Sequence, residues 1–180
     1  MEDGGGFRTA ITEDLAEFLA GIDTAYLATA NADGQPYAQH RGGPKGFIRV
    51  LDDHTIGFAD YAGNRQYVTA GNLSENDKAF LFLMDYAHRR RIKLWGRARV
   101  VRDDPKLLAV LMPEGYRAKP EQAVLFDVAA WDVNCPQHIP QKLDAEEVAA
   151  ALAKLEAQNK ILAAESAELR RQLEMERTKR

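Results

Sequence analysis

The residues best suited to chemistry form a basic, glycine-rich block between positions 39 and 65. It contains Arg41, Lys45, Arg49 and Arg65, each near a glycine, in a chain of formal net charge −3. Phosphate is bound by guanidinium groups and by the free N–H groups at a helix N-terminus. The segment Gly63-Asn64-Arg65, expected where a strand gives way to a helix, offers both. The block indicates a phosphate or anion site, although solvated surface cations and loop glycines would give the same pattern.

A second basic run, His88 to Arg91, falls between two strong strand patterns. At a hairpin tip such a run is either a solvated turn or a contact from a partner chain to an anionic ligand. Nucleic acid binding is the least supported interpretation, because proteins that bind nucleic acid are usually basic overall.

The elements that would position these residues are read from periodicity and capping. Within residues 92–101 one face is apolar and the other basic, as in a half-buried strand, with Ile92, Leu94, Ala98 and Val100 predicted to face inward. Thr12 followed by Glu13 and Asp14, and Asp104 followed by Pro105, are helix start signals. Strands are expected at 25–30, 36–40, 47–51, 55–59, 78–84, 92–101 and 124–131, and short helices from 12, from 63 to 72 and from 106 to 112. This order predicts an α+β fold, an antiparallel β-barrel of six or seven strands with short helices.

The composition changes after Gln141, and from Leu143 onward there is no glycine, proline or aromatic residue. Apolar residues follow a heptad pattern, which predicts a parallel coiled-coil helix over residues 143–180. Asn159 at a core position favours a dimer in register, and Glu165 can pair with Arg170 of the other chain. The alternative is one amphipathic helix docked on its own barrel. Positions d fall on Val148, Leu155, Leu162 and Leu169, and positions a on Leu152, Asn159, Ser166 and Leu173.

Composition narrows the class of protein. Apolar residues make up 46% and charged residues 28% of the 180 residues, as in ordinary globular proteins. The single cysteine, Cys135, allows no intrachain disulfide, and no apolar run is long enough to span a membrane. Residues 1–8 are expected to be a flexible leader without the apolar stretch of a secretory signal, which favours the cytoplasm.

Several segments together resemble a known family. They are Ala28–Pro36, Arg41–Pro44, Gly46–Asp52, Gly63–Arg65, Asn72–Phe82, the strand around Gly96 and Trp131–Gln141. In order and spacing they are similar to the FMN-binding split β-barrels related to pyridoxamine 5′-phosphate oxidase, within a subgroup of predicted flavin-nucleotide-binding proteins. The resemblance covers the domain expected at residues 9–142 and not the coiled coil.

The resemblance implies a homodimer with FMN at the shared interface. Arg49, Asn64 and Arg65 match the residues that bind the FMN phosphate. Gln66 replaces a lysine of the oxidases, so Lys45 or Arg41 would supply that contact. Ala59 and Asp60 match the strand along the isoalloxazine edge. Arg91 replaces a glutamine near the flavin, where a cation would stabilise the anionic reduced ring.

The segment Trp131–Gln141 is the other candidate site. Cys135 and His138 form a CxxH pair, but two ligands do not make a structural zinc site, and no metal is expected. A redox or nucleophilic cysteine would require His138 to lower its pKa. The favoured interpretation is that the segment shapes the pocket over the flavin, with Trp131 beside the ring and His138 in polar contact.

Three functions follow from these observations. The first is an FMN-dependent oxidoreductase acting on a small molecule, in which the cofactor carries the chemistry. Pyridoxamine phosphate is a poor candidate, because the chain lacks the arginine-rich ending that binds the substrate phosphate. The second is a non-catalytic flavin-binding or sensor module whose coiled coil docks a partner. The third is haem binding through His138 or His40. For the flavin functions, a deazaflavin would fit the same groove as FMN.

Overall fold

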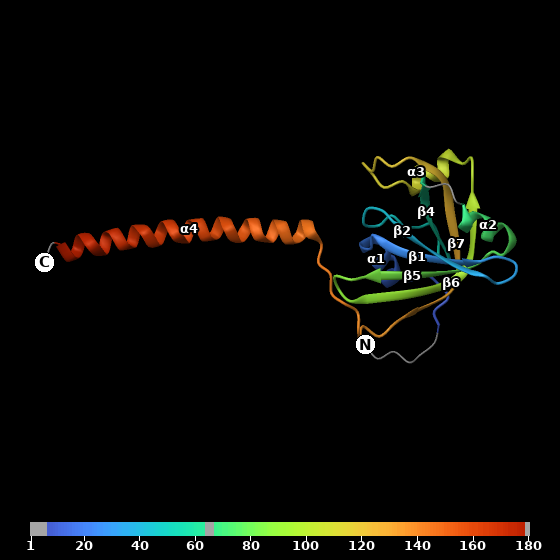
Figure 1. Ribbon diagram of the computed structural model, residues 1–180, viewed down its shortest axis with the longest axis horizontal. Coiled ribbons are helices and arrows are strands. Elements are labelled where there is room, and N and C mark those ends of the chain that lie inside the picture. The colour runs from blue at the N-terminus through green and yellow to red at the C-terminus, as the bar shows by residue number, and fades with distance from the viewer. Residues whose placement is uncertain (1–6, 64–66, 179–180) are drawn as a thin grey trace. The chain divides into compact units, whose positions relative to one another are not determined.

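A computed structural model describes residues 7–63 and 67–178, and it divides into one unit up to Pro140 and another from Gln141 (Figure 1). The first unit contains one antiparallel sheet of seven strands in the order β2-β1-β5-β6-β7-β4-β3. The strands are β1 Thr24–Ala30, β2 Pro36–Gly42, β3 Arg49–Val50, β4 Thr55–Tyr61, β5 Lys78–Asp85, β6 Arg90–Val101 and β7 Pro120–Val133. The helices are α1 Glu13–Gly21, α2 Val68–Glu75, α3 Pro105–Leu111 and α4 Ala145–Thr178. The predicted α+β split-barrel class is confirmed.

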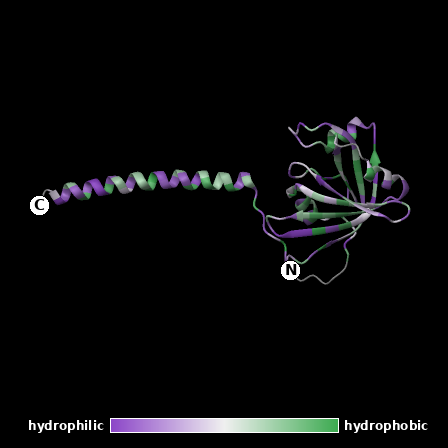
Figure 2. Ribbon diagram, in the orientation of Figure 1, coloured by the Kyte–Doolittle hydropathy of each residue, from purple (hydrophilic) through white to green (hydrophobic). Residues whose placement is uncertain are grey.

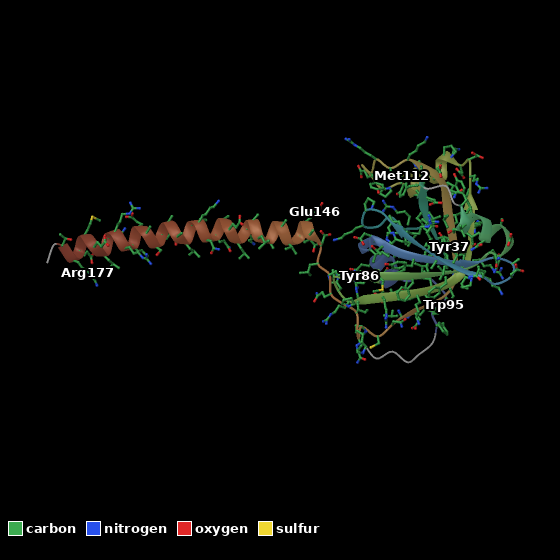
Figure 3. The ribbon with its side chains drawn as sticks, in the orientation of Figure 1. Tyr37, Tyr86, Trp95, Met112, Glu146 and Arg177 are labelled. Carbon is green, nitrogen blue, oxygen red and sulfur yellow. The ribbon has the colours of Figure 1, made fainter. Side chains whose placement is uncertain are left out.

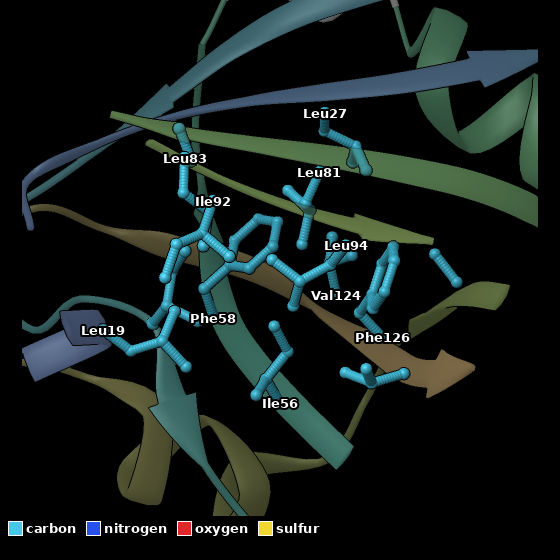
Figure 4. Close-up of a cluster of buried hydrophobic side chains, with 14 of the residues drawn as sticks. Leu19, Leu27, Ile56, Phe58, Leu81, Leu83, Ile92, Leu94, Val124 and Phe126 are labelled. Carbon is cyan, nitrogen blue, oxygen red and sulfur yellow. The ribbon is translucent and has the colours of Figure 1, made fainter. Parts of the chain in front are cut away.

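The core lies between the inner faces of the strands (Figure 4). Leu27 of β1, Leu81 of β5 and Leu94 of β6 are all fully buried. Along β6 the residues predicted to face inward are Ile92, Leu94, Ala98 and Val100. The first three are buried and Val100 is partly buried against the same core, which confirms the alternation read from the sequence. The apolar stripe of α1 packs against the same cluster. This packing fixes the strands that carry the candidate site.

Two helices begin where their caps predict. The Thr12 hydroxyl accepts a hydrogen bond from the Leu15 N–H at 3.4 Å, and α1 starts at the next residue. The Asp104 carboxylate accepts from the Leu107 N–H at 2.9 Å, with Pro105 opening α3. Both caps satisfy an N–H group that has no partner within its helix.

The third short helix differs from its prediction. Helix α2 begins at Val68 and ends at Glu75, whereas the sequence predicted a start at Gly63. Tyr67 has a left-handed backbone conformation with φ of 48°, which prevents the helix from continuing toward the N-terminus. The predicted start of this helix at Gly63 is therefore wrong, and Asn64, Arg65 and Gln66, on which the predicted phosphate contacts depend, lie outside the described residues.

Other boundaries differ from their predictions as well. The strand predicted over 47–51 forms ladder pairs only at Arg49 and Val50, because the Phe47 N–H belongs to the preceding turn, where it donates to the Pro44 carbonyl at 3.0 Å. Strand β7 begins at Pro120, before the predicted residue 124. Arg8, assigned to the leader, exchanges two backbone hydrogen bonds with Trp131 of β7, of 3.1 and 2.8 Å, so ordered pairing begins within the predicted leader.

The second unit is the single helix α4, of 34 residues. No residue in its described length is buried, and apolar and polar residues alternate in patches along it (Figure 2). The helices of the described residues include none with both the length and the apolar character needed to cross a bilayer. The predicted long C-terminal helix is thus present, while its pairing with a second copy remains a prediction.

Candidate functional site

A polar pocket lies where α2 covers the ends of β2, β4, β6 and β7. Two of its lining residues, Arg41 and Asp60, were expected to bind a cofactor. The wall is made by Gln39, Arg41, Asp60, Tyr61, Gly63, Tyr67, Thr69, Ala70, Val100, Glu121, Gln122 and Val124.

The centre of the pocket is a chain of charge-assisted hydrogen bonds. Arg41 forms an ion pair with one oxygen of Asp60, and the exposed fractions of these side chains are only 12% and 17%. The Gln122 amide donates to the other Asp60 oxygen at 2.8 Å, and Arg102 Nε donates to the Gln122 carbonyl at 3.1 Å. Both oxygens of Asp60 are thus engaged, which fixes the orientation of the carboxylate.

Arg41 still has an unused donor. Its Nε is buried and has no hydrogen-bond partner among the described residues. The guanidinium carbon lies 6.0 Å from the centre of the Phe58 ring, so the group stands against an apolar wall. A buried donor without an acceptor costs about 1–3 kcal/mol. The pocket can therefore accept a ligand atom that carries negative charge or a lone pair.

Helix α2 is held over the pocket by two side-chain hydrogen bonds. Thr69 donates to the Gln39 side-chain carbonyl of β2 at 2.8 Å. The Asn72 amide donates to the Thr29 hydroxyl of β1 at 3.0 Å, and both of these residues are buried. These bonds place the start of α2 beside the pocket.

Tyr61 gives the pocket a neutral hydroxyl. Burial raises the pKa of its phenol, and nearby Tyr116 raises it further. The two rings meet edge to face with their centroids 5.3 Å apart. Because the shift is upward from an already high pKa, the phenol keeps its proton at neutral pH and can donate a hydrogen bond.

Arg49 occupies a second position suited to an anion. It lies on β3 opposite Gly57 of β4, outside the pocket lining, and its Nε is buried without a partner among the described residues. Strand β3 ends its pairing here, so no described strand pairs with that edge of β4 from Phe58 to Tyr61. This open edge presents backbone N–H and C=O groups beside Arg49.

The other predicted cofactor residues have different surroundings. Ala59 is 3% exposed and packs against Leu111, Ala123 and Leu125, so only its backbone can meet a ligand. Lys45 is exposed in the turn after β2. Arg91 lies at the opposite end of β6 from Val100 of the pocket wall, about 30 Å away at the usual rise of a strand. The structure therefore does not bring Arg91 to Arg41 and Asp60 within one chain.

The basic run before Arg91 forms the predicted hairpin tip. His88 and Arg90 are exposed, and both donate to the Asp85 carboxylate, Arg90 at 2.8 Å. Burial alone would raise the pKa of Asp85, but these hydrogen bonds lower it below its usual value. The run is tied to its own hairpin by this carboxylate.

The segment from Trp131 to Gln141 divides between core and surface. The Trp131 indole is 1% exposed and donates to the Ala10 carbonyl at 2.8 Å, so it packs within the core. Cys135 and His138 are exposed, and His138 has a left-handed φ of 62°. Over the described residues, no three His, Cys, Asp or Glu side chains are grouped to hold a metal ion.

Sequence reasoning missed the residues that complete the pocket. Gln122 precedes the apolar run Ala123–Phe126, and this position is the only hint that the sequence offers. In the structure Gln122 is 4% exposed, and a buried amide requires partners. Gln39 and Thr69 are common surface residues in sequence, and only the closure of α2 over β2 brings them together.

Comparison with known protein families identifies the family of this chain. Residues 11–135 match the family model for pyridoxamine 5′-phosphate oxidase, which covers more than half of the chain. The chain belongs to the pyridoxamine 5′-phosphate oxidase family. The comparison with curated proteins gave no match.

Two solved structures show how far the similarity in fold extends. HupZ of Group A Streptococcus is 18% identical, with a TM-score of 0.55, over 74% of this chain and 99% of HupZ. An FMN-binding protein of Syntrophomonas wolfei is 11% identical, with a TM-score of 0.51, over 66% of this chain and 81% of that protein. Identities this low show a shared fold only.

Proposed function

We propose that this chain is an FMN-binding flavoprotein that works as a homodimer and acts as an FMN-dependent oxidoreductase on a small molecule. Family membership supports the proposal, and so does the shared fold with an FMN-binding protein. The single observation that carries it is the buried Arg49 Nε, which has no hydrogen-bond partner among the described residues and lies next to the open edge of β4.

The described residues fit the two ends of FMN. A phosphate would give Arg49 the acceptor that its buried Nε lacks, and Arg41 has the same need. Asn64 and Arg65, which are expected to complete the phosphate site, lie outside the described residues, and their sequence neighbours Gly63 and Tyr67 line the pocket. The backbone of Ala59 and Asp60 on the open edge suits the polar edge of the isoalloxazine ring.

The protein would position the cofactor while the cofactor supplies hydride transfer. Asp60 is held by Arg41 and Gln122, so the strand beside the ring is rigid at this point. Tyr61 offers a neutral hydroxyl at the pocket wall. These residues bind and orient, and none is required to act as an acid or base.

The long helix supports the homodimer. In α4 the apolar positions Leu155, Leu162 and Leu169 are 55%, 60% and 60% exposed, although they follow one heptad seam. A parallel coiled coil with a second copy would cover them and place Asn159 opposite its equivalent. Two chains held in this way are related by a twofold axis, as the shared flavin interface requires.

The first experiment is the absorption spectrum and mass of the ligand that copurifies with the full chain. Bands near those of free FMN and the mass of FMN are expected. A Soret band would replace the proposal with haem binding, and a deazaflavin mass would change the cofactor. Reduction of the bound flavin by NAD(P)H without oxygen then distinguishes an enzyme from a passive flavin module.

Arg49→Ala tests the phosphate contact. A charge-assisted hydrogen bond contributes about 1.5–3 kcal/mol, so FMN affinity should fall about 10-fold to 150-fold by fluorescence quenching. Arg99→Ala is the matched control, because Arg99 is 52% exposed and already paired with Asp127. Equal affinities in the two variants would remove Arg49 from the site.

A further inference from the structure

Arg49 and Arg41 approach strand β4 from opposite faces of the sheet. Arg49 is paired with Gly57, and paired residues of neighbouring strands point to the same face. A Cβ at Gly57 would meet Leu111 of α3, so Arg49 lies on the face that α3 covers. Arg41 lies instead near the ring of Phe58, which belongs to the main core on the other face. Of the two arginines, only Arg41 lines the pocket.

Side-chain donors line this pocket. Gln39 and Arg41 are partly buried on β2 together with Tyr37, which Figure 3 labels, while the residues between them are exposed. Arg41 Nε is buried and has no partner among the described residues. Thr69 donates to the Gln39 carbonyl, so the amide N–H groups of Gln39 remain to donate. Burial raises the pKa of the Tyr61 phenol, so its hydroxyl keeps its proton and is a further donor.

The side-chain acceptors beside these donors are already in use. Asp60 accepts from Arg41 through one oxygen and from Gln122 through the other. The Gln122 carbonyl in turn accepts from Arg102 Nε at 3.1 Å. Because a hydrogen bond joins one donor and one acceptor, the unused donors of the pocket select a ligand group that is itself an acceptor. A carboxylate, a phosphate and a carbonyl group all have that character.

Charge and volume narrow the choice among these groups. Asp60 already balances the charge of Arg41, and the pocket is also lined by Glu121, which accepts from the Tyr67 hydroxyl at 3.5 Å. No cation of the described wall is therefore left over for a dianion, which the two carboxylates would repel. The cavity has a volume of about 60 Å³, and one water molecule needs about 10–15 Å³. It has room for a carboxylate group and none for a flavin ring.

We propose that this pocket binds the carboxylate of a small organic monoanion through Arg41 Nε, the Gln39 amide and the Tyr61 hydroxyl. The inference rests on the proposed FMN-dependent function, in which this carboxylate belongs to the substrate. Asp60 and Tyr61 line the pocket and also belong to the open edge of β4, so the two sites meet at the end of this strand. The carboxylate binds on the core side of β4, while Arg49 on the other side serves the cofactor.

The Nε–H group of Arg41 reports occupancy of the pocket in ¹⁵N NMR of the full chain. Acetate is the probe, with chloride at the same ionic strength as the reference. Acetate is expected to shift the Arg41 resonance to saturation, because the buried N–H gains an acceptor. The Arg99 resonance should stay in place, because Arg99 is 52% exposed and already paired with Asp127. An Arg41 resonance that acetate does not move would mean that the pocket holds water only, and would overturn the proposal.

Substitutions test the donors separately. Arg41→Lys keeps a cation opposite Asp60 and removes the Nε donor, so acetate affinity should fall about 10-fold to 150-fold. Gln39→Leu removes the amide and should lower acetate affinity at least about tenfold. Gln35→Leu is the matched control, because Gln35 is an exposed glutamine just before β2. Equal acetate affinity in Gln39→Leu and Gln35→Leu, with strand circular dichroism intact, would contradict the proposed donor set.

FMN binding in the same samples separates this inference from the proposed function. FMN and acetate should bind together, so saturation with acetate should leave FMN affinity unchanged. Competition between them would show that the cofactor occupies the pocket, and would overturn the carboxylate site. A chain that binds acetate at Arg41 and takes up no FMN refutes the flavin function alone. A chain that binds FMN and shows no acetate response refutes the carboxylate site alone.

Discussion

The barrel and the C-terminal helix use apolar residues in opposite ways. In the barrel Leu27, Leu81 and Leu94 are completely buried within one chain. In α4 Leu155 and Leu162 are 55% and 60% exposed, and no residue of that helix is buried. Burial of apolar area is the main favourable contribution to folding. The barrel therefore contains its own source of stability, whereas the helix needs another chain to supply one.

Removing a core leucine should give the largest effect. Leu94→Ala leaves a cavity between strands and should lower the free energy of unfolding of the barrel by about 2–5 kcal/mol. The measurement is chemical denaturation followed by the circular dichroism of the strands. The loss should not depend on protein concentration, because the contacts of Leu94 lie within one chain. A loss below about 1 kcal/mol would show that this core is not the source of stability.

The matching change in the helix should behave differently. Leu155→Ala should leave unfolding of the barrel unchanged and should lower the melting temperature of the helix, more strongly in dilute solution. Stability that comes from association follows mass action. Circular dichroism at 222 nm over a hundredfold dilution series is the test. Melting that is independent of concentration would mean that the helix is not stabilised by a second copy.

A pair of glycines tests how tightly the sheet is packed. A Cβ at Gly96 would collide with the Asp127 carbonyl and lie 2.7 Å from the Phe126 ring, where β6 and β7 shift register. Gly96→Ala should therefore destabilise the barrel by about 1–3 kcal/mol in thermal unfolding. At Gly71 of α2 a Cβ meets nothing within 4 Å. Gly71→Ala should stabilise by about 0.4–1 kcal/mol, and equal effects would contradict the packing.

Local patterns predicted much of the fold. The alternation of residues 92–100 and the caps at Thr12 and Asp104 act within a few residues, so the sequence alone carries them. The prediction of where α2 starts failed, because nothing about a tyrosine in the sequence indicates that its backbone will be left-handed. The predicted start of β3 was too early, because the Phe47 N–H bonds to the Pro44 carbonyl in a turn before the strand begins.

The pocket depended on contacts that no local pattern contains. Arg41 and Asp60 were each singled out, but their ion pair joins β2 and β4, which are not neighbours in the sheet. Gln122 lies next to an apolar run, and its role is visible only once Asp60 is placed beside it. Long-range closure of the barrel produces this network, and a single sequence does not show which strands close.

The smallest expected effect is a pH dependence of stability that belongs to the barrel and not to the helix. Hydrogen bonds from His88 and Arg90 hold the pKa of Asp85 below its usual value despite burial, and the carboxyl of the unfolded chain titrates near pH ~4. Because the pKa is lower in the folded state, the charged carboxylate stabilises the fold. This contribution is complete above the pKa of the unfolded chain and is lost as the pH falls through the pKa of the folded state. Asp85→Asn should therefore weaken the barrel at pH 7 and make no difference in strong acid, where the wild-type carboxyl is protonated.

Denaturation of the barrel at both pH values is the measurement. Helix melting should be the same in both proteins, because Asp85 belongs to the barrel. An equal deficit at both pH values would assign the effect to packing instead of charge.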